Sequence, residues 1–394
     1  MICRVCGSGT EQIFSLGEMP LANSLLASPD ESYPTFPLNL VKCESCTLVQ
    51  LEETVPPEQL FVDYNYLTSC SPPMVEHAKR LVEEVISRKT LTEDSYIVEV
   101  GSNDGYLLQH YKSTGARVLG IDPSEKAAEI ATQKGVWTLK GFFNHYMAQG
   151  LNQKADIIHA NNVLAHVPDL NDFVAGLAHL LKDDGTLIVE VPYLCSLIDK
   201  TAFDTIYHEH VYYFSLTALS RLFRRHNLII SDAQEISTHG GSLRLWVTKS
   251  GVPSQNVLLL YNQEYYSVSG QASGYYRDFS LRVEKCKFDT RKLLHGKQAV
   301  GFGAAAKATI FLNACGLTSS DLAYVVDDTP TKQGKYIPGT GIPIVSSAEW
   351  LERQPPFTLI LCWNFSHDIA HRYRHSYRGR LFTWYTPDFA EAHA

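Results

Sequence analysis

A run of titratable side chains, Tyr-His-Glu-His, occupies positions 207–210 of the chain. Histidine can take up a proton near neutral pH, and a tyrosine hydroxyl can hydrogen-bond to the anion that remains. A carbon atom must lose a proton before it can attack an electrophile, so the run suits enolate formation beside a carbonyl group. Its HExH spacing is not the HExxH of zinc proteases, which argues against a metal here. A buried polar network that braces a domain joint is the structural alternative.

The backbone conformation decides which of these side chains can act together. In an extended strand, Tyr207 and Glu209 would point to one face, and His208 and His210 to the other. A turn or a helix would mix the two sets.

A second group of residues surrounds a glycine-containing loop, Glu-Val-Gly-Ser-Asn-Asp-Gly-Tyr-Leu, at positions 99–107. A buried strand is expected to run into Gly101 and Gly105, whose missing side chains let a ligand approach the backbone. Asp122 follows Gly101 by 21 residues, at the end of the next predicted strand. This spacing matches the carboxylate that holds a ribose diol in doubly wound folds.

The loop differs from the GxGxxG that holds a dinucleotide pyrophosphate, and its GxNxG form around Asn103 favours a ligand without phosphates. Glu99 and Asp122 supply two carboxylates for a ligand that carries an ammonium and a sulfonium group. The loop therefore predicts S-adenosylmethionine as cofactor. Glycines that merely pack, or a dehydrogenase, are the alternatives.

Polar residues also follow the strand predicted at 157–160. Ligands of parallel α/β sheets bind at the carboxyl ends of the strands, where Asn161 and Leu164 are expected to contact the cofactor. His166 is expected to face the reacting methyl group or the acceptor, with a helix-capping role as the alternative.

Four of the nine cysteines form two CxxC pairs, Cys3 with Cys6 and Cys43 with Cys46. Four thiolates complete the tetrahedral shell of Zn²⁺ and leave no position for water, so the predicted zinc site is structural. A disulfide or free thiols are the alternative for these cysteines.

The elements that position these residues follow from the apolar pattern. Apolar residues at helical spacing predict a helix over 74–89 that leads into the core. Strands are then predicted at 96–100, 117–121, 157–160 and 186–191, separated by helical stretches. Such alternation is typical of parallel sheets with crossover helices. A further α/β unit is predicted from 298, with strands at 298–302, 323–326 and 358–362, after a largely helical connector at 254–295.

The predicted fold class is α/β, with a central Rossmann-like class I S-adenosylmethionine-binding domain. The predicted boundaries are 1–70 for a zinc-binding domain, 71–250 for the cofactor domain and 251–394 for a C-terminal Rossmann-like domain with its connector. The chain has 394 residues, 45% of them hydrophobic, which suffices for more than one core.

The formal net charge of -8 disfavours a nucleic-acid partner, because such proteins normally present a basic surface. No apolar run reaches membrane-spanning length and no apolar signal core follows Met1, so we expect a cytoplasmic protein without a membrane partner. The sequence does not indicate an oligomeric state.

The chain resembles the sugar C-methyltransferases that act on thymidine diphosphate-linked keto-deoxysugars in antibiotic pathways. The resemblance covers almost the whole chain and rests on separated motifs in order: the two CxxC pairs, EVGSNDG at 99–105, the stretch 161–170, YHEH at 207–210, HGGSLR at 239–244 and the stretch 325–344. It implies a zinc-binding, a cofactor-binding and a C-terminal Rossmann-like domain, with a nucleotide sugar between them.

The resemblance also implies roles for individual residues. His210 would be the base that takes the proton next to the 4-keto group, and methyl transfer would go to C3 of the enolate. Tyr207, Glu209, His166 and Tyr64 would line the same pocket.

The C-terminal unit is expected to hold the diphosphate of this substrate. An acidic protein needs local cations for that, which nominates Arg244, Lys307 and Lys332, with solvated surface side chains as the alternative. The motifs at 308–310 and 327–328 depart from the usual family pattern, so the nucleotide or the sugar can differ from the common one.

Two other functions are compatible with these residues. One is a methyltransferase that acts on oxygen or nitrogen, or on the carbon of a non-sugar metabolite. The other is a non-catalytic zinc- and nucleoside-binding module, against which the intact set of Glu99, Gly101, Gly105 and Asp122 argues.

Overall fold

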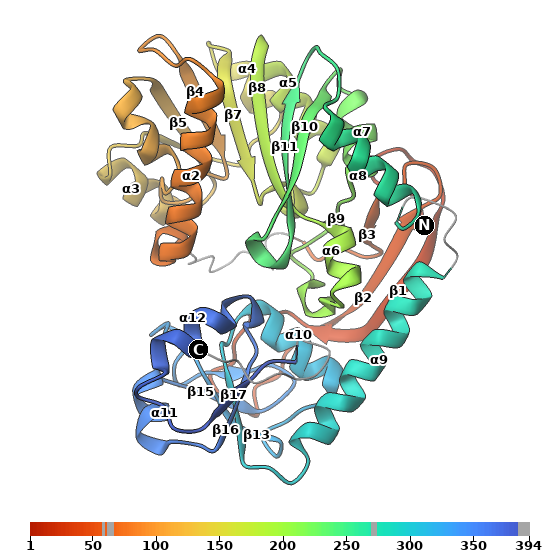
Figure 1. Ribbon diagram of the computed structural model, residues 1–394, viewed down its shortest axis with the longest axis vertical. Helices are drawn as coiled ribbons and strands as arrows, with labels where there is room; N and C mark the ends of the chain where they lie inside the picture. The colour runs from red at the N-terminus through yellow and green to blue at the C-terminus, as the bar shows by residue number, and fades with distance from the viewer. Residues whose placement is uncertain (57–59, 61–66, 269–273, 385–394) are drawn as a thin grey trace.

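Three β-sheets divide the chain into an N-terminal, a central and a C-terminal unit. The computed structural model describes residues 1–56, 60, 67–268 and 274–384. Figure 1 shows the central and C-terminal units as two lobes, and the long N-terminal strands run beside both of them. Within the described residues, no helix combines the length and the apolar composition needed to cross a bilayer.

The N-terminal sheet has four antiparallel strands in the order β1-β2-β3-β9. Its strands are β1 (Thr10–Pro20), β2 (Thr35–Cys43), β3 (Val49–Leu51) and β9 (Tyr212–Tyr213). The last strand comes from the middle of the chain, directly after the 207–210 run. The N-terminal sheet is therefore completed by a strand that the sequence did not predict.

The central sheet has seven strands in the order β10-β11-β8-β7-β4-β5-β6. The strands from β8 to β6 in this order are parallel, and β11 and β10 add an antiparallel edge. Their bounds are β4 (Tyr96–Val100), β5 (Arg117–Asp122), β6 (Thr138–Lys140), β7 (Ala155–Asn161), β8 (Leu181–Pro192), β10 (Ile229–Ile236) and β11 (Ser242–Thr248). The four strands predicted in this region are confirmed.

Helices flank this sheet (Figure 1). They are α2 (Pro72–Arg88), α3 (Glu125–Gln133), α4 (His145–Gly150), α5 (Leu170–Leu180), α6 (Leu194–Asp199), α7 (Leu216–Arg224) and α8 (Gln255–Tyr265). Short 3₁₀ turns lie between them at η1 (Thr68–Cys70), η2 (Leu108–Thr114), η3 (Leu164–His166), η4 (Phe203–Thr205) and η5 (Thr238–Gly240).

Helix α2 shows why the predicted helix forms. Proline stands in its first turn, where no intrahelical N–H is needed. The helix buries one stripe of apolar residues at helical spacing against the sheet: Met74, Ala78, Leu81, Val82 and Val85. The prediction for 74–89 is confirmed to within two residues at each end.

The C-terminal unit is a six-stranded sheet in the order β14-β15-β13-β12-β16-β17, parallel except for β14. Its strands are β12 (Ala299–Phe302), β13 (Leu322–Val326), β14 (Tyr336–Ile337), β15 (Ile342–Val345), β16 (Phe357–Ile360) and β17 (Arg380–Phe382). Its helices are α9 (Tyr275–Leu294), α10 (Ala306–Cys315), α11 (Ser347–Arg353) and α12 (Ser366–Tyr373), with a 3₁₀ turn η6 (Trp363–Phe365).

Two predictions for this half of the chain are refined by the structure. The strand predicted at 358–362 ends at Ile360, because the chain turns into η6. The largely helical connector predicted at 254–295 consists of two helices, α8 and the 20-residue α9.

Candidate active site

The glycine loop lies at the carboxyl end of β4, where the chain leaves the centre of the sheet. Gly101 and Gly105 have φ values of 72° and 75°, a left-handed conformation that favours glycine. A Cβ atom on Gly101 would lie 3.3 Å from the Cβ of Val163, so the loop leaves little room for a side chain. Asn103 is also left-handed, with φ of 47°.

Asp122 ties this loop to the end of β5. Its carboxylate accepts hydrogen bonds from the backbone N–H of Asn103 and of Ser124, both at 2.8 Å. These hydrogen bonds fix the position of the Asp122 carboxylate relative to the loop, at the carboxyl ends of the parallel strands.

Several buried side chains at this end of the sheet lack a hydrogen-bond partner among the described residues, and two of them bear on the cofactor. Glu99 is 1% exposed, and both its carboxylate oxygens are without a hydrogen bond among the described residues. The side-chain amide of Asn161, at the end of β7, is likewise buried and unpaired there. Burial, together with the negative charges of Asp122 and Asp104, raises the pKa of Glu99 well above its usual value. Buried polar groups without partners are rare, so both groups fit a site for a polar, cationic ligand such as S-adenosylmethionine.

The 207–210 run forms a turn, so the alternative in which an extended strand separates Tyr207 from His210 is wrong. The backbone N–H of His210 donates to the carbonyl of Tyr207 at 2.9 Å. The turn also joins the hydroxyl of Tyr207 to Nε2 of His210, again at 2.9 Å. The other imidazole nitrogen, Nδ1 of His210, lies 3.1 Å from the carbonyl of Thr205.

His166 lies against this turn from η3. Its Nδ1 donates to the backbone carbonyl of Glu209 at 2.8 Å, and its ring centroid is 4.9 Å from that of His210. The structure thus brings His166, Tyr207, Glu209 and His210 together, as the sequence analysis expected. Leu164 begins the same 3₁₀ turn and is fully buried.

A small cavity adjoins His210 and is lined in part by Thr205, Tyr193 and Tyr213. The hydroxyl of Tyr213 is buried beside the backbone of Tyr207. Burial raises the pKa of Tyr213, so the hydroxyl stays protonated and available as a donor.

Lys307 extends from α10 of the C-terminal unit. Its Nζ donates to Oδ1 of Asn364 at 2.6 Å and lies 4.6 Å from the ring centroid of Trp363. The indole N–H of Trp363 donates to the buried carboxyl of Asp204 at 2.8 Å. Burial raises the pKa of Asp204 to about 7, although the charge of Lys307 opposes the shift. The charge of Lys307 also contributes to lowering the pKa of His210, so this cation belongs to the surroundings of the turn.

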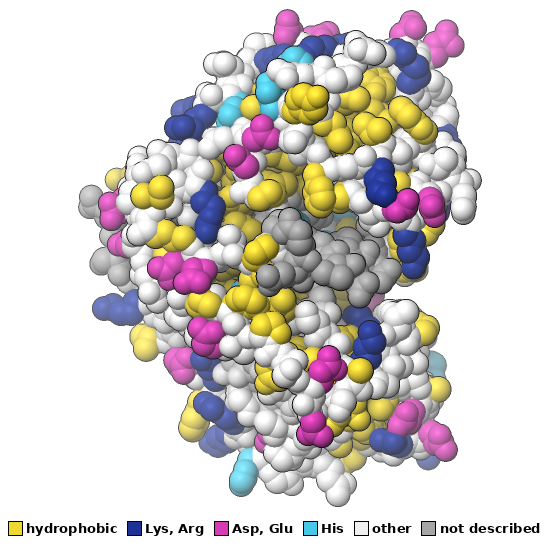
Figure 2. Space-filling model, turned by 180° about the vertical axis from the view of Figure 1, so that it is seen from behind, with side chains coloured by type: hydrophobic (Ala, Val, Ile, Leu, Met, Phe, Trp, Pro, Cys, Tyr) yellow, Lys and Arg dark blue, Asp and Glu magenta, His cyan; other side chains and the backbone are white. Residues whose placement is uncertain are grey.

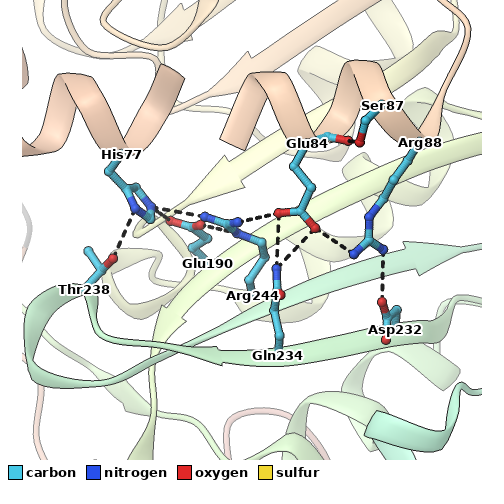
Figure 3. A network of polar contacts seen from close by, with 9 residues as sticks. All are labelled: His77, Glu84, Ser87, Arg88, Glu190, Asp232, Gln234, Thr238 and Arg244. Atoms are coloured by element: carbon cyan, nitrogen blue, oxygen red, sulfur yellow. Dashed lines mark hydrogen bonds and ion pairs between the residues drawn. The ribbon is translucent and has the colours of Figure 1, made fainter. Parts of the chain in front are cut away.

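Arg244 does not join Lys307, and our expectation that it binds phosphate needs correction. Its guanidinium donates from Nε to Glu190 at 2.6 Å and from Nη1 to Glu84 at 2.7 Å (Figure 3). His77 of α2 lies 2.7 Å from the same Glu190. Since Arg244 is 7% exposed and two carboxylates already neutralise it, it serves as an internal brace between α2 and the sheet.

Lys332 and Tyr64 are the two remaining residues that the sequence predicted for the site. Lys332 donates to the carbonyl of Ala304 at 2.8 Å and pairs with Asp327 at 3.4 Å, so it too has an internal partner. Tyr64 lies outside the described residues.

The four predicted zinc ligands converge. The Sγ atoms of Cys3, Cys6, Cys43 and Cys46 all lie within 4.8 Å of one another, with 3.6 Å between Cys3 and Cys46 and 3.4 Å between Cys6 and Cys43. Four thiolates at about 2.3 Å from a tetrahedral zinc ion stand about 3.8 Å apart. The set therefore fits one Zn²⁺ ion with a closed coordination shell.

Thr205, Asp204 and Asn23 are site residues that the sequence analysis missed. The carbonyl of Thr205 and the amide of Asn23 belong to no sequence motif, and only the fold brings them to the site. Asn23 is moreover far from the 207–210 run in the sequence. Asp204 could have been predicted from the sequence, because it is an acidic residue three positions before the YHEH run.

Three family models match successive parts of the chain. They are “Putative zinc binding domain” over residues 3–61, “Methyltransferase domain” over 74–231 and “C-methyltransferase C-terminal domain” over 237–387. A relative, the C-methyltransferase NovU of Streptomyces niveus, is 34% identical over 383 residues, which cover 93% of this chain and 90% of the relative.

The chain belongs to this family of C-methyltransferases. As a member, it uses S-adenosylmethionine as methyl donor and binds zinc through its four-cysteine cluster. The class I methyltransferase fold expected for the central unit is confirmed by the domain match and by the strand order.

Other similarities of this C-methyltransferase are partial. The ubiquinone biosynthesis O-methyltransferase of Bartonella quintana (strain Toulouse) is 31% identical over 101 residues, which cover 25% of this chain and 41% of that protein. Among solved structures, the magnesium protoporphyrin IX methyltransferase of Synechocystis PCC 6803 with bound S-adenosylmethionine aligns with a TM-score of 0.36. It is 20% identical, over 45% of this chain and 79% of that chain.

Proposed function

We propose that this C-methyltransferase removes the proton next to the ketone of a nucleotide-linked 4-keto deoxysugar and methylates the resulting enolate carbon, C3. The nucleotide we propose is thymidine diphosphate. The observation that carries the proposal is the fixed imidazole of His210, which is held between Thr205 and Tyr207.

The hydrogen bonds of His210 decide which nitrogen is basic. A carbonyl oxygen only accepts hydrogen bonds, so Nδ1 carries the hydrogen and donates it to Thr205. Nε2 is then the nitrogen with the lone pair, and it accepts from the hydroxyl of Tyr207. Burial is the main cause that lowers the pKa of His210 well below its usual value, and the charge of Lys307 adds to this shift. The imidazole is therefore neutral near pH 7 and is ready to accept a proton.

The neighbouring groups suit the charges that develop after proton removal. When the hydroxyl of Tyr207 turns from Nε2 to the bound acceptor, it frees the lone pair of Nε2 for the proton and can donate its own hydrogen bond to the enolate oxygen. His166 lies against the His210 ring and anchors the backbone of Glu209. Tyr64 is proposed for the same pocket on family resemblance alone.

The cofactor is proposed to lie at the carboxyl edge of the central sheet. The residues proposed to contact it are Glu99, Gly101, Asn103, Gly105, Asp122, Asn161 and Leu164. S-adenosylmethionine supplies an electrophilic methyl group there. The unpaired carboxylate of Glu99 and the amide of Asn161 provide the acceptors and the donor that a polar ligand needs in this buried place.

The nucleotide is proposed to bind the C-terminal unit through Lys307. This ammonium is held by Asn364 and Trp363, and its charge acts on His210, so a diphosphate bound to it would place the attached sugar toward the turn. Arg244 is left out of this site because Glu84 and Glu190 already pair with it.

Product analysis tests the acceptor class. The zinc-loaded protein is incubated with ¹³C-methyl-labelled S-adenosylmethionine and a panel of thymidine diphosphate-linked keto sugars, and the products are examined by NMR. The proposal expects a labelled methyl group bonded to carbon next to the ketone. A labelled O-methyl signal, or no transfer to any sugar of the panel, would contradict it.

A further inference from the structure

The loop after β1 is anchored on the C-terminal unit at two points. The hydroxyl of Thr309 in α10 donates to the carbonyl of Ala22 at 2.9 Å. Four residues later, Leu26 exchanges two backbone hydrogen bonds with Tyr336, at 2.9 Å and 2.8 Å. Asn23 lies between these anchors, so the C-terminal unit helps to fix its position.

From this place Asn23 reaches the central unit. Its Nδ2 donates to Oε1 of Glu209 at 2.5 Å. Among the described residues, no other side chain is hydrogen-bonded to this carboxylate. Glu209 is 7% exposed whereas Asn23 is exposed, so the pair lies at the boundary between the buried turn and solvent.

The N-terminal unit holds a second residue of the same turn. Nε2 of His208 lies 3.2 Å from the carbonyl of Phe36 in β2. Together with the pairing of β3 and β9, these contacts flank His210 on both sides along the chain. The N-terminal unit therefore sets the conformation of the turn as well as binding zinc.

The charge state of Glu209 depends on this contact. Burial raises the pKa of Glu209 to about 7, and the hydrogen bond from Asn23 opposes that shift. The histidines of this region are His166, which contacts the backbone of Glu209, and His208 and His210 of the same turn; their pKa values are all lowered, chiefly by burial. These neutral rings give little electrostatic support, so the amide of Asn23 is the group that favours the carboxylate form.

We propose that Asn23 is a positioning residue of the acceptor site: it holds the carboxylate of Glu209, on the 207–210 turn, so that the carboxylate can accept a hydrogen bond from an acceptor hydroxyl. The inference rests on the proposed function, since it requires an oxygen-rich acceptor bound against the 207–210 turn. Asn23 acts through Glu209 and takes no part in the proton transfer itself.

The test compares two asparagines of the N-terminal unit. Asn39 donates to Glu52 at 2.9 Å in the same kind of Asn–Glu pair, and its partner is not part of the 207–210 turn, so Asn39→Ala is the matched control for Asn23→Ala. The probe is a thymidine diphosphate-linked 4-keto-6-deoxy sugar that the wild-type protein methylates. We expect Asn23→Ala to raise the KM for the sugar by roughly 10- to 100-fold, the effect of one hydrogen bond to a charged group. The KM for S-adenosylmethionine is expected to stay unchanged.

The pH dependence of kcat/KM gives a second test, because it would not change in Asn23→Ala if Asn23 had a purely structural role. Without the donor of Asn23 the ionised form of Glu209 is less favoured, so its pKa rises and the acid limb of kcat/KM moves to higher pH. Asn23→Gln, which keeps an amide, should recover part of the activity.

The possible outcomes distinguish a failure of this inference from a failure of the proposed function. If the wild-type protein methylates none of the sugars, the proposed function fails first. If the wild-type protein is active and Asn23→Ala keeps its KM and its pH profile, the inference is overturned. Equal losses in Asn23→Ala and Asn39→Ala, with equally lowered melting temperatures, would overturn it too, because the effect would then be one of folding.

Discussion

The buried carboxylate of Glu99 is placed to bind a ligand rather than another protein group. Its two oxygens are unpaired among the described residues, and burial favours its neutral form. A ligand with an ammonium group reverses this preference, because a nearby positive charge stabilises the carboxylate. Binding of the cofactor should therefore be coupled to loss of a proton from Glu99.

This coupling gives a pH-dependent affinity. Because the raised pKa leaves Glu99 protonated at low pH, S-adenosylmethionine should bind more tightly as the pH rises through that pKa. Glu99→Gln should weaken binding roughly 10-fold at high pH and flatten the dependence, since a glutamine does not ionise. Calorimetry between pH 5.5 and 8.5 measures both effects. Glu93→Gln, exposed on the loop at the other end of β4, should behave as the wild type; an unchanged pH dependence in Glu99→Gln would refute the role of Glu99.

At the residue level, the sequence predicted which side chains gather but not all of their contacts. Spacing alone related Gly101 to Asp122, because the glycine loop and the next strand are local features. The bond between Tyr207 and His210 required the backbone of the turn, for which two conformations were open. Arg244 was misassigned because its partner Glu84 lies on a helix 160 positions away in the sequence, and such contacts leave no local signal.

At the level of elements, α2 is attached to the sheet by a polar network as well as by its apolar stripe. Figure 3 shows His77, Glu84 and Arg88 of α2 facing Glu190, Arg244 and Asp232 of the strands. Glu190 is 2% exposed, and it needs its cationic partner because an unpaired buried carboxylate is costly.

Removing Arg244 should therefore destabilise the protein markedly. Arg244→Met is expected to cost about 3 kcal/mol, the low end of the range for a broken buried pair, since His77 still contacts Glu190. Arg80→Ala removes an exposed pair with Glu76 on the same helix and should cost less than about 0.5 kcal/mol. Urea denaturation compares the two variants. Equal, small losses would show that the network contributes nothing.

The zinc cluster is linked to the 207–210 turn through β3. Cys46 precedes β3 by three residues, and β3 pairs with β9, which begins two residues after His210. Leu51 of β3 also donates from its backbone to the carbonyl of Val211 at 2.9 Å. Loss of the metal should consequently disturb the turn and not only the N-terminal unit.

Metal removal tests this link. Purified protein is expected to carry one zinc ion per chain, and Cys43→Ser should lose the ion, part of its thermal stability and its activity. Cys286→Ser, in α9 and outside the cluster, is the control and should retain zinc. A metal-free preparation with full activity would exclude the structural site.

At the scale of the whole molecule, the candidate site is assembled from three units. The central unit supplies the glycine loop and His210, the C-terminal unit supplies Lys307, and the N-terminal unit supplies Asn23. Figure 2 shows a hollow between the two lobes on the face that it displays. The alternation of strands and helices predicted the central and C-terminal sheets, because crossover connections are local. The pairing of β9 with β3 joins residues more than 160 positions apart, and two short strands carry too little pattern to predict it.

Deuterium exchange tests the central claim, proton removal by His210, most directly. The wild-type protein is incubated in deuterium oxide with a thymidine diphosphate-linked 4-keto sugar and without S-adenosylmethionine, and the hydrogen at C3 is followed by NMR. We expect enzyme-dependent exchange in the wild type and in the control His226→Gln, and none in a folded His210→Gln variant. Retained exchange in His210→Gln would contradict the assignment of His210 as the base.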